Sequence, residues 1–191
     1  MNTPFAPSAG NPALRSPYLV PGLFSPEECG RIIASVGDAP LVRDPYSSQH
    51  PETVIGENGE RRLLQKPEVA EWVLHRIMQA GFQVNQQHFR FVIEGMEVPH
   101  LITYRTGQES YWHMDITDDQ TTNRKLTMLV FLSAPQSYTG GRFMVHPESL
   151  QIDQSQGNLL LFPAFLLHRV EPVLSGTRYS LATWGVGPAF R

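Results

Sequence analysis

The sequence predicts an α+β domain, mainly β, in which an antiparallel sandwich or barrel is covered by two helices. Two observations carry this prediction. Seven short runs with alternating apolar and polar residues fill the second half of the chain, and two helical patterns precede them. Alternation with a period of two is typical of strands that bury one face, and strands without intervening helices are typical of antiparallel sheets. With 191 residues, 41% of them hydrophobic, the chain can bury one substantial core.

The beginning of the chain predicts an arm followed by one continuous domain. Residues 1–17 contain four prolines and little apolar content, which is typical of a flexible segment. Residues 18–191 contain no internal repeat and no low-complexity linker, so we expect a single domain there, with a β core at about 87–187. Tyr18–Leu23 is expected to form the first strand.

Two helices are predicted ahead of the other strands. The tetrapeptide Ser-Pro-Glu-Glu at 25–28 supplies a capping serine, a proline for the first helical position and the glutamate of a capping box. Gly37 is expected to end this helix. Pro67 opens the second helical pattern, and Gly81 is expected to close it. The apolar stripe of this second helix consists of Val69, Trp72, Val73, Ile77 and Ala80.

Seven strands are predicted after about residue 82, each a short run of alternating character. Turn signals at Tyr138–Gly141 and Ser175–Thr177 separate some of these runs. The predicted strands are His88–Glu94, Val98–Tyr104, Lys125–Leu132, Arg142–His146, Asn158–Phe162, Leu166–Val173 and Arg178–Val186.

Composition excludes several classes of protein. Fifteen basic and 18 acidic residues give a net charge of −3 without a basic stripe, so we expect no nucleic-acid partner. The longest apolar stretch, Leu159–Leu167, is too short to span a bilayer, and we expect no membrane partner. The N-terminus has no signal-peptide pattern, so a cytoplasmic location is expected. Cys29 is the single cysteine, which rules out a disulfide framework.

A histidine and carboxylate set is the first candidate site. His113 and Asp115 are two apart, so in an extended segment both side chains point to the same side. His168 follows a strongly apolar run and therefore needs a polar partner. Each residue alone also fits a structural role. Together, two histidines and one carboxylate can form a facial triad with open positions, which is typical of non-haem Fe(II) oxygenases, although Zn²⁺ accepts the same ligands.

Three further residues are candidates for binding a small ligand. Arg178 and Ser180 share one face of the last predicted strand, where a guanidinium and a hydroxyl fit one carboxylate group. Tyr104 ends an earlier strand, just before the segment that leads to His113, and its phenol is expected to reach a ligand near the metal.

Segment 101–186 resembles the Fe(II)/2-oxoglutarate-dependent dioxygenases, and among them the prolyl 4-hydroxylase-like branch. A similar opening strand and helix at Leu19–Cys29 extend the resemblance over most of residues 18–187. The motifs are Tyr104-x-x-Gly107-Gln108-x-x-Tyr111-x-His113-x-Asp115, Gly140-Gly141, Leu161-Phe162-Pro163-x-x-x-x-His168-x-Val170 and Gly176-x-Arg178-Tyr179-Ser180.

This resemblance implies a double-stranded β-helix, or jelly roll, with supporting helices at its N-terminal side. It implies Fe(II) as the metal, 2-oxoglutarate as cosubstrate, dioxygen as oxidant and ascorbate as a stimulant. The implied iron ligands and catalytic residues are His113, Asp115 and His168.

The resemblance also assigns the cosubstrate contacts. Arg178 would pair with the distal carboxylate of 2-oxoglutarate, with Ser180 or Thr127 as helpers. Tyr104 would hydrogen-bond the cosubstrate near the metal. Some relatives have a tyrosine on the strand where this chain has Phe131, so that hydrogen bond would be missing or come from elsewhere.

The implied reaction is hydroxylation of an unactivated C–H bond, with release of succinate and carbon dioxide. The expected substrate is a prolyl residue in a protein or peptide, or a free amino acid or other small metabolite. Nucleic-acid demethylation by the same chemistry is disfavoured by the net charge of −3. The alternative from another class is a non-catalytic or zinc-binding jelly-roll module that uses the same three ligands.

Two polar loops are expected to carry substrate contacts. Residues 43–66 form a long polar segment, and long loops in compact domains are often functional. Arg61 and Arg62 within it are the candidates for binding an anionic group of the substrate. Thr117–Asn123, just after Asp115, is the second such loop.

Overall fold

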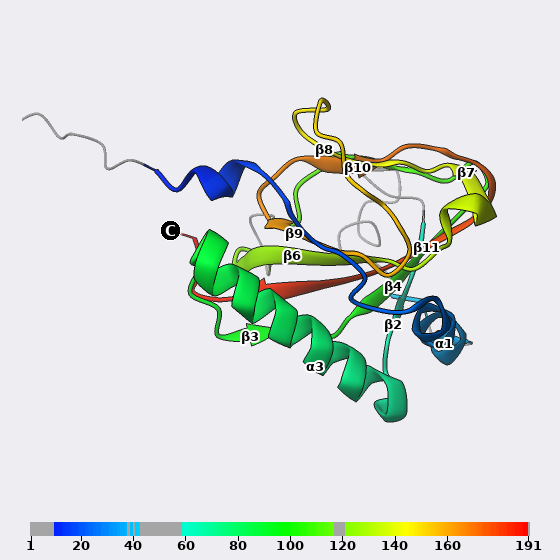
Figure 1. Ribbon diagram of the computed structural model, residues 1–191, viewed down its shortest axis with the longest axis horizontal. Coiled ribbons are helices and arrows are strands. Elements are labelled where there is room, and N and C mark those ends of the chain that lie inside the picture. Colours follow the sequence, from blue (N-terminus) through cyan, green and yellow to red (C-terminus); the bar gives the residue numbers. More distant parts are fainter. Residues whose placement is uncertain (1–9, 38, 40, 43–58, 117–120, 191) are drawn as a thin grey trace, which may run out of the picture.

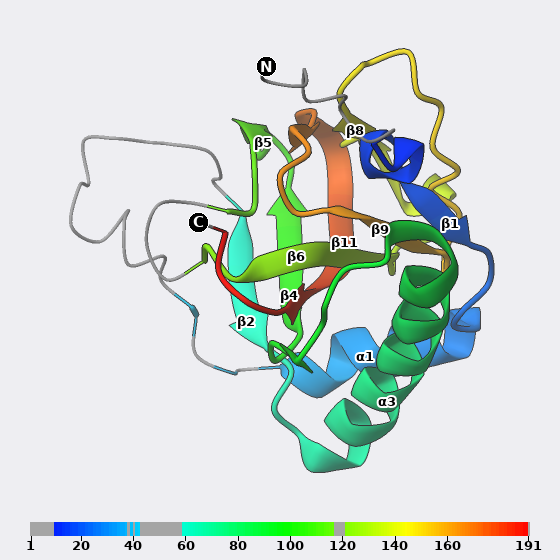
Figure 2. The same cartoon turned by 90° about the vertical axis from the view of Figure 1, so that its left-hand side faces the viewer.

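A computed structural model gives the structure of the protein at residues 10–37, 39, 41–42, 59–116 and 121–190. In this part of the chain two helices lie against one face of a large sheet, and a smaller sheet faces the other side (Figures 1 and 2). None of the helices there is long and apolar enough to cross a membrane. The helical elements are α1 (Pro26–Val36) and α3 (Pro67–Val84), with short helices η1 (Pro12–Arg15), η2 (Asn85–Phe89) and η3 (Pro135–Ser137).

Both sheets are antiparallel. The large sheet has the strand order β1-β9-β6-β11-β4-β2, and β3 and β7 also pair with β11. Its strands are β1 (Tyr18–Val20), β2 (Glu60–Leu63), β3 (Gly95–Met96), β4 (His100–Arg105), β6 (Arg124–Phe131), β7 (Tyr138–Gly140), β9 (Leu159–Pro163) and β11 (Val173–Val186). The small sheet, in the order β5-β10-β8, consists of β5 (Ser110–His113), β8 (Phe143–Val145) and β10 (His168–Val170).

The period-two alternation of the strands divides the core into two clusters. On β9, Leu159 and Leu161 pack against the helices, whereas Leu160 and Phe162 point between the two sheets. Phe143 of β8 meets them there from the small sheet. The predicted fold, a mainly β jelly roll with two supporting helices, is confirmed. The cluster between the two sheets supplies apolar residues that line the site described below.

Helix α1 begins and ends as predicted. The Ser25 hydroxyl accepts a hydrogen bond from the backbone N–H of Glu28 at 3.3 Å, and the Glu28 carboxylate accepts one from the backbone N–H of Ser25 at 2.9 Å. Gly37, with a positive φ of 42°, follows the last helical residue. Cys29 is fully buried in this helix, and its burial raises the pKa of the thiol to about 11, so the single cysteine is a core residue.

The predicted end of α3 at Gly81 is wrong, because the helix continues to Val84. Gly81 is buried on the face that meets the large sheet, where a β-carbon would lie 2.6 Å from the sulfur of Met128. The glycine therefore permits close packing of the helix on β6 instead of ending the helix.

The predicted strand His88–Glu94 is also wrong. Asn85–Phe89 forms η2, a π-helical turn that continues α3. The Asn85 side chain then accepts a hydrogen bond from the N–H of Phe91 at 3.0 Å and donates one to its carbonyl at 2.9 Å. Phe89 and Phe91 alternate with polar residues, which is the pattern of a strand. The Asn85 side chain, however, satisfies the backbone N–H and carbonyl of Phe91 locally, in place of a neighbouring strand.

The turn predicted at Ser175–Thr177 lies inside β11, since Gly176 adopts a φ of 77° where β11 pairs with β7. Four further strands were not predicted: β2, β5, the two-residue β3 and β7, which lies where a turn was predicted at Tyr138–Gly141. β2 is the charged sequence Glu-Arg-Arg-Leu at 60–63, and β5 is the polar sequence Ser-Tyr-Trp-His at 110–113. Neither has the apolar alternation of a half-buried strand.

Part of the predicted arm and loops can be placed. In residues 10–17, the η1 turn lies close to η2, and the Asn11 amide donates hydrogen bonds to the carbonyls of His88 at 2.9 Å and Phe89 at 3.1 Å. Residues 1–9, 43–58 and 117–120, which hold the rest of the predicted arm and most of both predicted loops, lie outside the described residues.

We expect Gly157→Ala to destabilise the protein far more than Gly107→Ala. Both glycines have a φ of 85°, so alanine at either position meets left-handed strain of about 1–2 kcal/mol. At Gly107 a β-carbon has nothing within 4 Å, whereas at Gly157 it would overlap the carbonyl oxygen of Phe24. That overlap adds about 1–3 kcal/mol. Urea unfolding of both variants measures the loss in the free energy of unfolding. Equal losses would show that the backbone at Phe24, just before α1, moves away from the new methyl group at no cost.

Candidate active site

A pocket lies between the two sheets and receives side chains from strands on both sides. Its apolar wall includes Leu129, Phe143 and Phe162, which belong to the core between the sheets. Its polar lining consists of Arg61, Tyr104, Ser110, His113, Asp115, Thr127, His168, Arg178 and Ser180. The predicted metal, cosubstrate and substrate residues therefore meet at one place, with the single exception of Arg62.

The three predicted metal ligands form one cluster. One ligand atom from each of His113, Asp115 and His168 lies within 4.8 Å of the others, and among the described residues no other group of three such side chains is this close. His113 on β5 pairs directly with His168 on β10. A register shift follows this pair, so that the four residues Ser110–His113 of β5 lie opposite the three residues His168–Val170 of β10, and such bulges re-aim side chains near functional sites.

Both imidazoles present the same nitrogen to the cluster. The Nδ1 atom of His113 lies 2.7 Å from the Tyr111 carbonyl, and that of His168 lies 2.9 Å from the Leu166 carbonyl. A carbonyl only accepts hydrogen bonds, so each Nδ1 carries the proton and each Nε2 keeps its lone pair. His168 Nε2 lies 3.6 Å from the Asp115 carboxylate. This backbone support of the far nitrogen is typical of metal-binding histidines.

The charges of the cluster also suit metal binding. Burial alone would raise the pKa of Asp115, but His168, His113 and the hydrogen bond from Thr127 together lower this pKa to about 2. Burial lowers the pKa of His168 to about 4, against the opposing effect of Asp115. At neutral pH the site therefore contains an ionised carboxylate and a neutral imidazole, which are the forms that bind metals.

Asp115 is held at its backbone and at its side chain. Its N–H donates to the Ala164 carbonyl at 2.9 Å, next to the end of β9. The Thr127 hydroxyl donates to its carboxylate at 2.6 Å. In this structure Thr127 therefore contacts the predicted metal ligand and lines the same pocket as Arg178 and Ser180, and its role toward the cosubstrate stays a prediction.

Arg178 supplies a positive charge in the depth of the pocket. Only 1% of this residue is exposed, and its Nη1 donates to the Ser180 hydroxyl at 3.2 Å. Its guanidinium carbon lies 5.8 Å from the ring centre of Tyr104 and 5.9 Å from that of Phe131. The predicted cosubstrate residues Arg178, Ser180 and Tyr104 thus form one group, and Phe131 packs against it.

The two candidate arginines of β2 point to opposite sides. Arg61 pairs with Ile102, and both line the pocket. Its charge is one of the lesser causes that lower the pKa of His168, after burial and His113. Arg62 donates to the Ala39 carbonyl and lies 3.6 Å from the Glu60 carboxylate, away from the pocket. Alternation along a strand separates the two.

Ser110 and Trp184 are two lining residues with polar side-chain atoms that were not among the predicted ones. The Ser110 hydroxyl accepts a hydrogen bond from the backbone N–H of Val170 at 3.0 Å and so links β5 to β10. Trp184 lines the pocket and is 1% exposed. The sequence could have indicated Trp184, because alternation along the last predicted strand puts it on the same face as Arg178. Ser110 could not be found in this way, because it lies on β5, which was not predicted.

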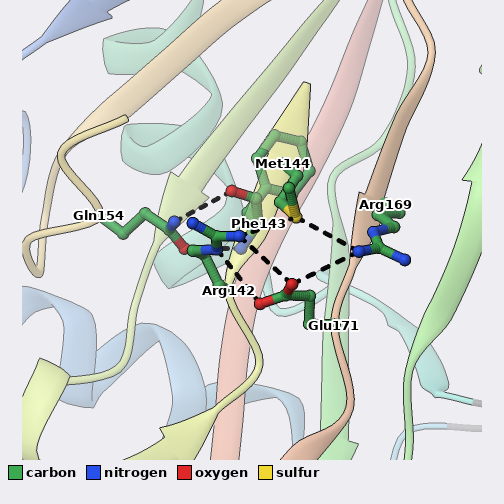
Figure 3. Close-up of polar contacts among 6 residues, drawn as sticks. All are labelled: Arg142, Phe143, Met144, Gln154, Arg169 and Glu171. Atoms are coloured by element: carbon green, nitrogen blue, oxygen red, sulfur yellow. Dashed lines mark hydrogen bonds and ion pairs between the residues drawn. The ribbon is translucent and has the colours of Figure 1, made fainter. Parts of the chain in front are cut away.

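The outer face of the small sheet is fixed by ion pairs (Figure 3). Glu171, just after β10, accepts hydrogen bonds from Arg142 at 3.2 and 3.3 Å and from Arg169 at 3.4 Å. Arg142 immediately precedes β8, so the pair ties β8 to the strand that carries His168. These arginines lie outside the pocket and neutralise one carboxylate on the surface.

Comparison with known proteins agrees with this geometry. Residues 99–185, which hold all three candidate metal ligands and Arg178, match the family model of the 2OG-Fe(II) oxygenase superfamily. The match spans 87 of the 191 residues, and over this stretch the chain is similar to that superfamily. The same match agrees with the predicted resemblance to the Fe(II)/2-oxoglutarate-dependent dioxygenases.

Two curated relatives are PKHD-type hydroxylases. The one from Synechococcus sp. strain CC9605 is 35% identical over 88 residues, which is 44% of this chain and 40% of that protein. The one from Synechococcus sp. strain JA-2-3B'a(2-13) is 27% identical over 176 residues, which is 85% of this chain and 74% of that protein. The match to the first relative therefore spans less than half of its length.

Two solved structures are similar in fold. A Pseudomonas putida prolyl-4-hydroxylase has a TM-score of 0.70 at 17% identity, covering 93% of this chain and 95% of its own. A Trichoplax adhaerens prolyl hydroxylase, solved with a peptide fragment of the hypoxia inducible factor, has a TM-score of 0.73 at 16% identity, covering 90% and 84%. At these identities the likeness shows the shared fold.

Proposed function

We propose that the protein is an Fe(II)- and 2-oxoglutarate-dependent dioxygenase that hydroxylates an unactivated C–H bond. One observation carries this proposal: the His113, Asp115 and His168 cluster and the buried Arg178 line the same pocket. A zinc or purely structural site needs the cluster but has no need of a buried guanidinium beside it. This distinction favours the dioxygenase over the jelly-roll binding module.

The donor set fits the implied metal. Two Nε2 atoms and one carboxylate form the facial set that leaves coordination positions open, and all three can converge on one ion. When bound, Fe(II) with 2-oxoglutarate and dioxygen supplies the oxidising power for hydroxylation, with release of succinate and carbon dioxide. His113, Asp115 and His168 would hold the metal, and the protein would exclude water and orient the substrate.

Arg178, Ser180 and Tyr104, which line the same pocket, would hold the cosubstrate. Arg178 with Ser180 offers a bidentate cation and a hydroxyl to the distal carboxylate of 2-oxoglutarate, in a buried place where such contacts are strong. Tyr104, on the neighbouring strand, would donate from its phenol near the metal. Ser110 is a further hydroxyl in the same lining.

For the substrate we propose a prolyl residue in a peptide or protein, with a free amino acid as the other candidate. The names of the relatives support the first, since both similar structures are prolyl hydroxylases and one was solved with a peptide. We further propose a cytoplasmic location, no nucleic-acid or membrane partner, and stimulation by ascorbate.

Succinate release tests this function. The purified protein would be incubated with Fe(II), 2-oxoglutarate, ascorbate and oxygen, with proline-containing peptides and free amino acids as separate panels. We expect succinate release that rises with a prolyl peptide. No succinate with any panel, together with no 2-oxoglutarate binding by the metal-loaded protein, would refute the proposal. Release only with free amino acids would move the substrate to the small-molecule class.

Arg61→Met is expected to weaken binding of the primary substrate. Arg61 is the second cation of the pocket, so its loss removes a contact to a carboxylate or carbonyl of the substrate. One such charge-assisted hydrogen bond contributes about 1.5–3 kcal/mol, which is at least about tenfold in KM. Steady-state kinetics with the most stimulating substrate measures this KM.

Arg62→Met is the matched control, because Arg62 is the neighbouring arginine but points away from the pocket. We expect this variant to keep the substrate KM of the wild type. If both variants changed the KM equally, a general effect of positive charge on β2 would replace the direct contact of Arg61.

A further inference from the structure

Arg124 joins the two ends of the connection between β5 and β6. It is the first residue of β6, and its Nη1 donates to the backbone carbonyl of Asp115 at 3.2 Å. The two residues are nine positions apart in the sequence. The contact therefore holds the backbone of Asp115, a predicted metal ligand, from the start of β6.

The Arg124 side chain is itself held in one orientation. Its Nε donates to one carboxylate oxygen of Glu97 at 2.6 Å and its Nη2 to the other at 2.7 Å, which is the bidentate arrangement. The Arg124 side chain is 14% exposed, so solvent weakens the pair less than at an open surface. Glu97 is in turn fixed by its backbone, since its N–H donates to the Trp184 carbonyl at 3.0 Å and its carbonyl accepts from the Thr183 hydroxyl at 2.7 Å.

The guanidinium also lies on a wall of the pocket. Its central carbon is 3.8 Å from the ring centre of Trp184, the distance of a stacked cation–π contact. Trp184 lines the pocket beside Asp115. Arg124 thus contacts the backbone of one predicted ligand and the outer face of a lining aromatic residue, without entering the pocket.

We propose that Arg124, oriented by Glu97, is a positioning residue for the metal site. It fixes the backbone of Asp115 while Thr127 fixes the carboxylate, so that the carboxylate faces the two imidazoles before the metal arrives. This inference rests on the proposed function, in which Asp115 is a metal ligand. Partners that orient a ligand in this way contribute about 10–100-fold to metal affinity.

Binding of Mn(II) to the intact protein under anaerobic conditions tests the inference, because it needs no turnover. We expect Arg124→Met to raise the Kd for Mn(II) by about 10–100-fold. The visible absorption of bound Co(II) is a second measurement, and we expect its intensity to change because the carboxylate is reoriented. Glu97→Gln keeps the shape of the partner and is expected to raise the Kd by a smaller factor.

Arg76→Met is the matched control. Arg76 on α3 makes a 2.7 Å ion pair with Glu28 and lies 5.1 Å from the ring centre of Trp72, and none of these three residues lines the pocket. This variant is expected to lose stability and keep the Kd for Mn(II) of the wild type. A wild-type Kd in folded Arg124→Met would overturn the inference. If Arg124→Met does not fold, an unchanged Kd and Co(II) spectrum in Glu97→Gln would overturn it. Failure of the wild type to bind Mn(II) would instead overturn the proposed function.

Discussion

Asp115→Ala is expected to abolish succinate release from 2-oxoglutarate. Asp115 supplies the only carboxylate of the cluster, and its pKa of about 2 means that it carries a full negative charge at neutral pH. Loss of a partner that merely orients a ligand costs about 10–100-fold, so we expect loss of the ligand itself to reduce kcat by more than about 100-fold. Succinate release at saturating Fe(II) and 2-oxoglutarate measures this loss.

Asp153→Ala is the control for this variant. Asp153 also accepts a hydroxyl hydrogen bond, from Ser155, but it lies exposed on the surface. We expect wild-type turnover from it. Circular dichroism of both variants would show whether Asp115→Ala is folded, and a folded Asp115→Ala protein with unchanged succinate release would refute the assignment of the three metal ligands.

Much of this site could be read from the sequence because its residues follow simple periodic rules. His113 and Asp115 are two apart, and Arg178 and Ser180 are two apart, so each pair faces one side of an extended chain. The resemblance to a known family then joined the pairs with His168. The rule that separates Arg61 from Arg62 is the same alternation, but it required knowing that residues 60–63 form a strand.

The Arg124 and Glu97 pair could not be predicted in this way. Glu97 lies 27 residues before Arg124 and outside any regular strand, so no local spacing connects them. The contact between Arg124 and Asp115 depends on where the connection from β5 returns to β6, which is a property of the tertiary fold. Residues that position a metal-binding residue without lining the pocket therefore leave no recognisable spacing in the sequence.

The errors in the fold have a similar cause. Gly81 in α3 was expected to end a helix, which is the usual local role of glycine near a helix terminus. Its actual role is to allow contact with Met128 on β6, 47 positions later in the chain. The predicted strand at His88–Glu94 failed because the side chain of Asn85 satisfies the backbone of Phe91 locally. A prediction from local sequence fails where packing against a distant residue, or a hydrogen bond from a nearby side chain, stabilises a different structure.

Arg178→Met is expected to raise the KM for 2-oxoglutarate by at least about 100-fold. The proposed role of Arg178 is a bidentate contact to the distal carboxylate, and each charge-assisted hydrogen bond contributes about 1.5–3 kcal/mol. Because this carboxylate is remote from the reacting carbon, the contact is the same in the ground state and the transition state. The effect should therefore appear in KM, with kcat changed much less at saturating 2-oxoglutarate.

Two comparisons make this prediction specific. Arg142→Met removes an arginine that pairs with Glu171 on the outer face of the small sheet, and it should leave the KM for 2-oxoglutarate unchanged. Arg178→Lys keeps the charge and loses the planar fork, so we expect a KM between those of the wild type and Arg178→Met. If Arg178→Met bound 2-oxoglutarate as tightly as the wild type, the anion site would have to use the other cation of the pocket, Arg61, and the substrate contact proposed for Arg61 would fail with it.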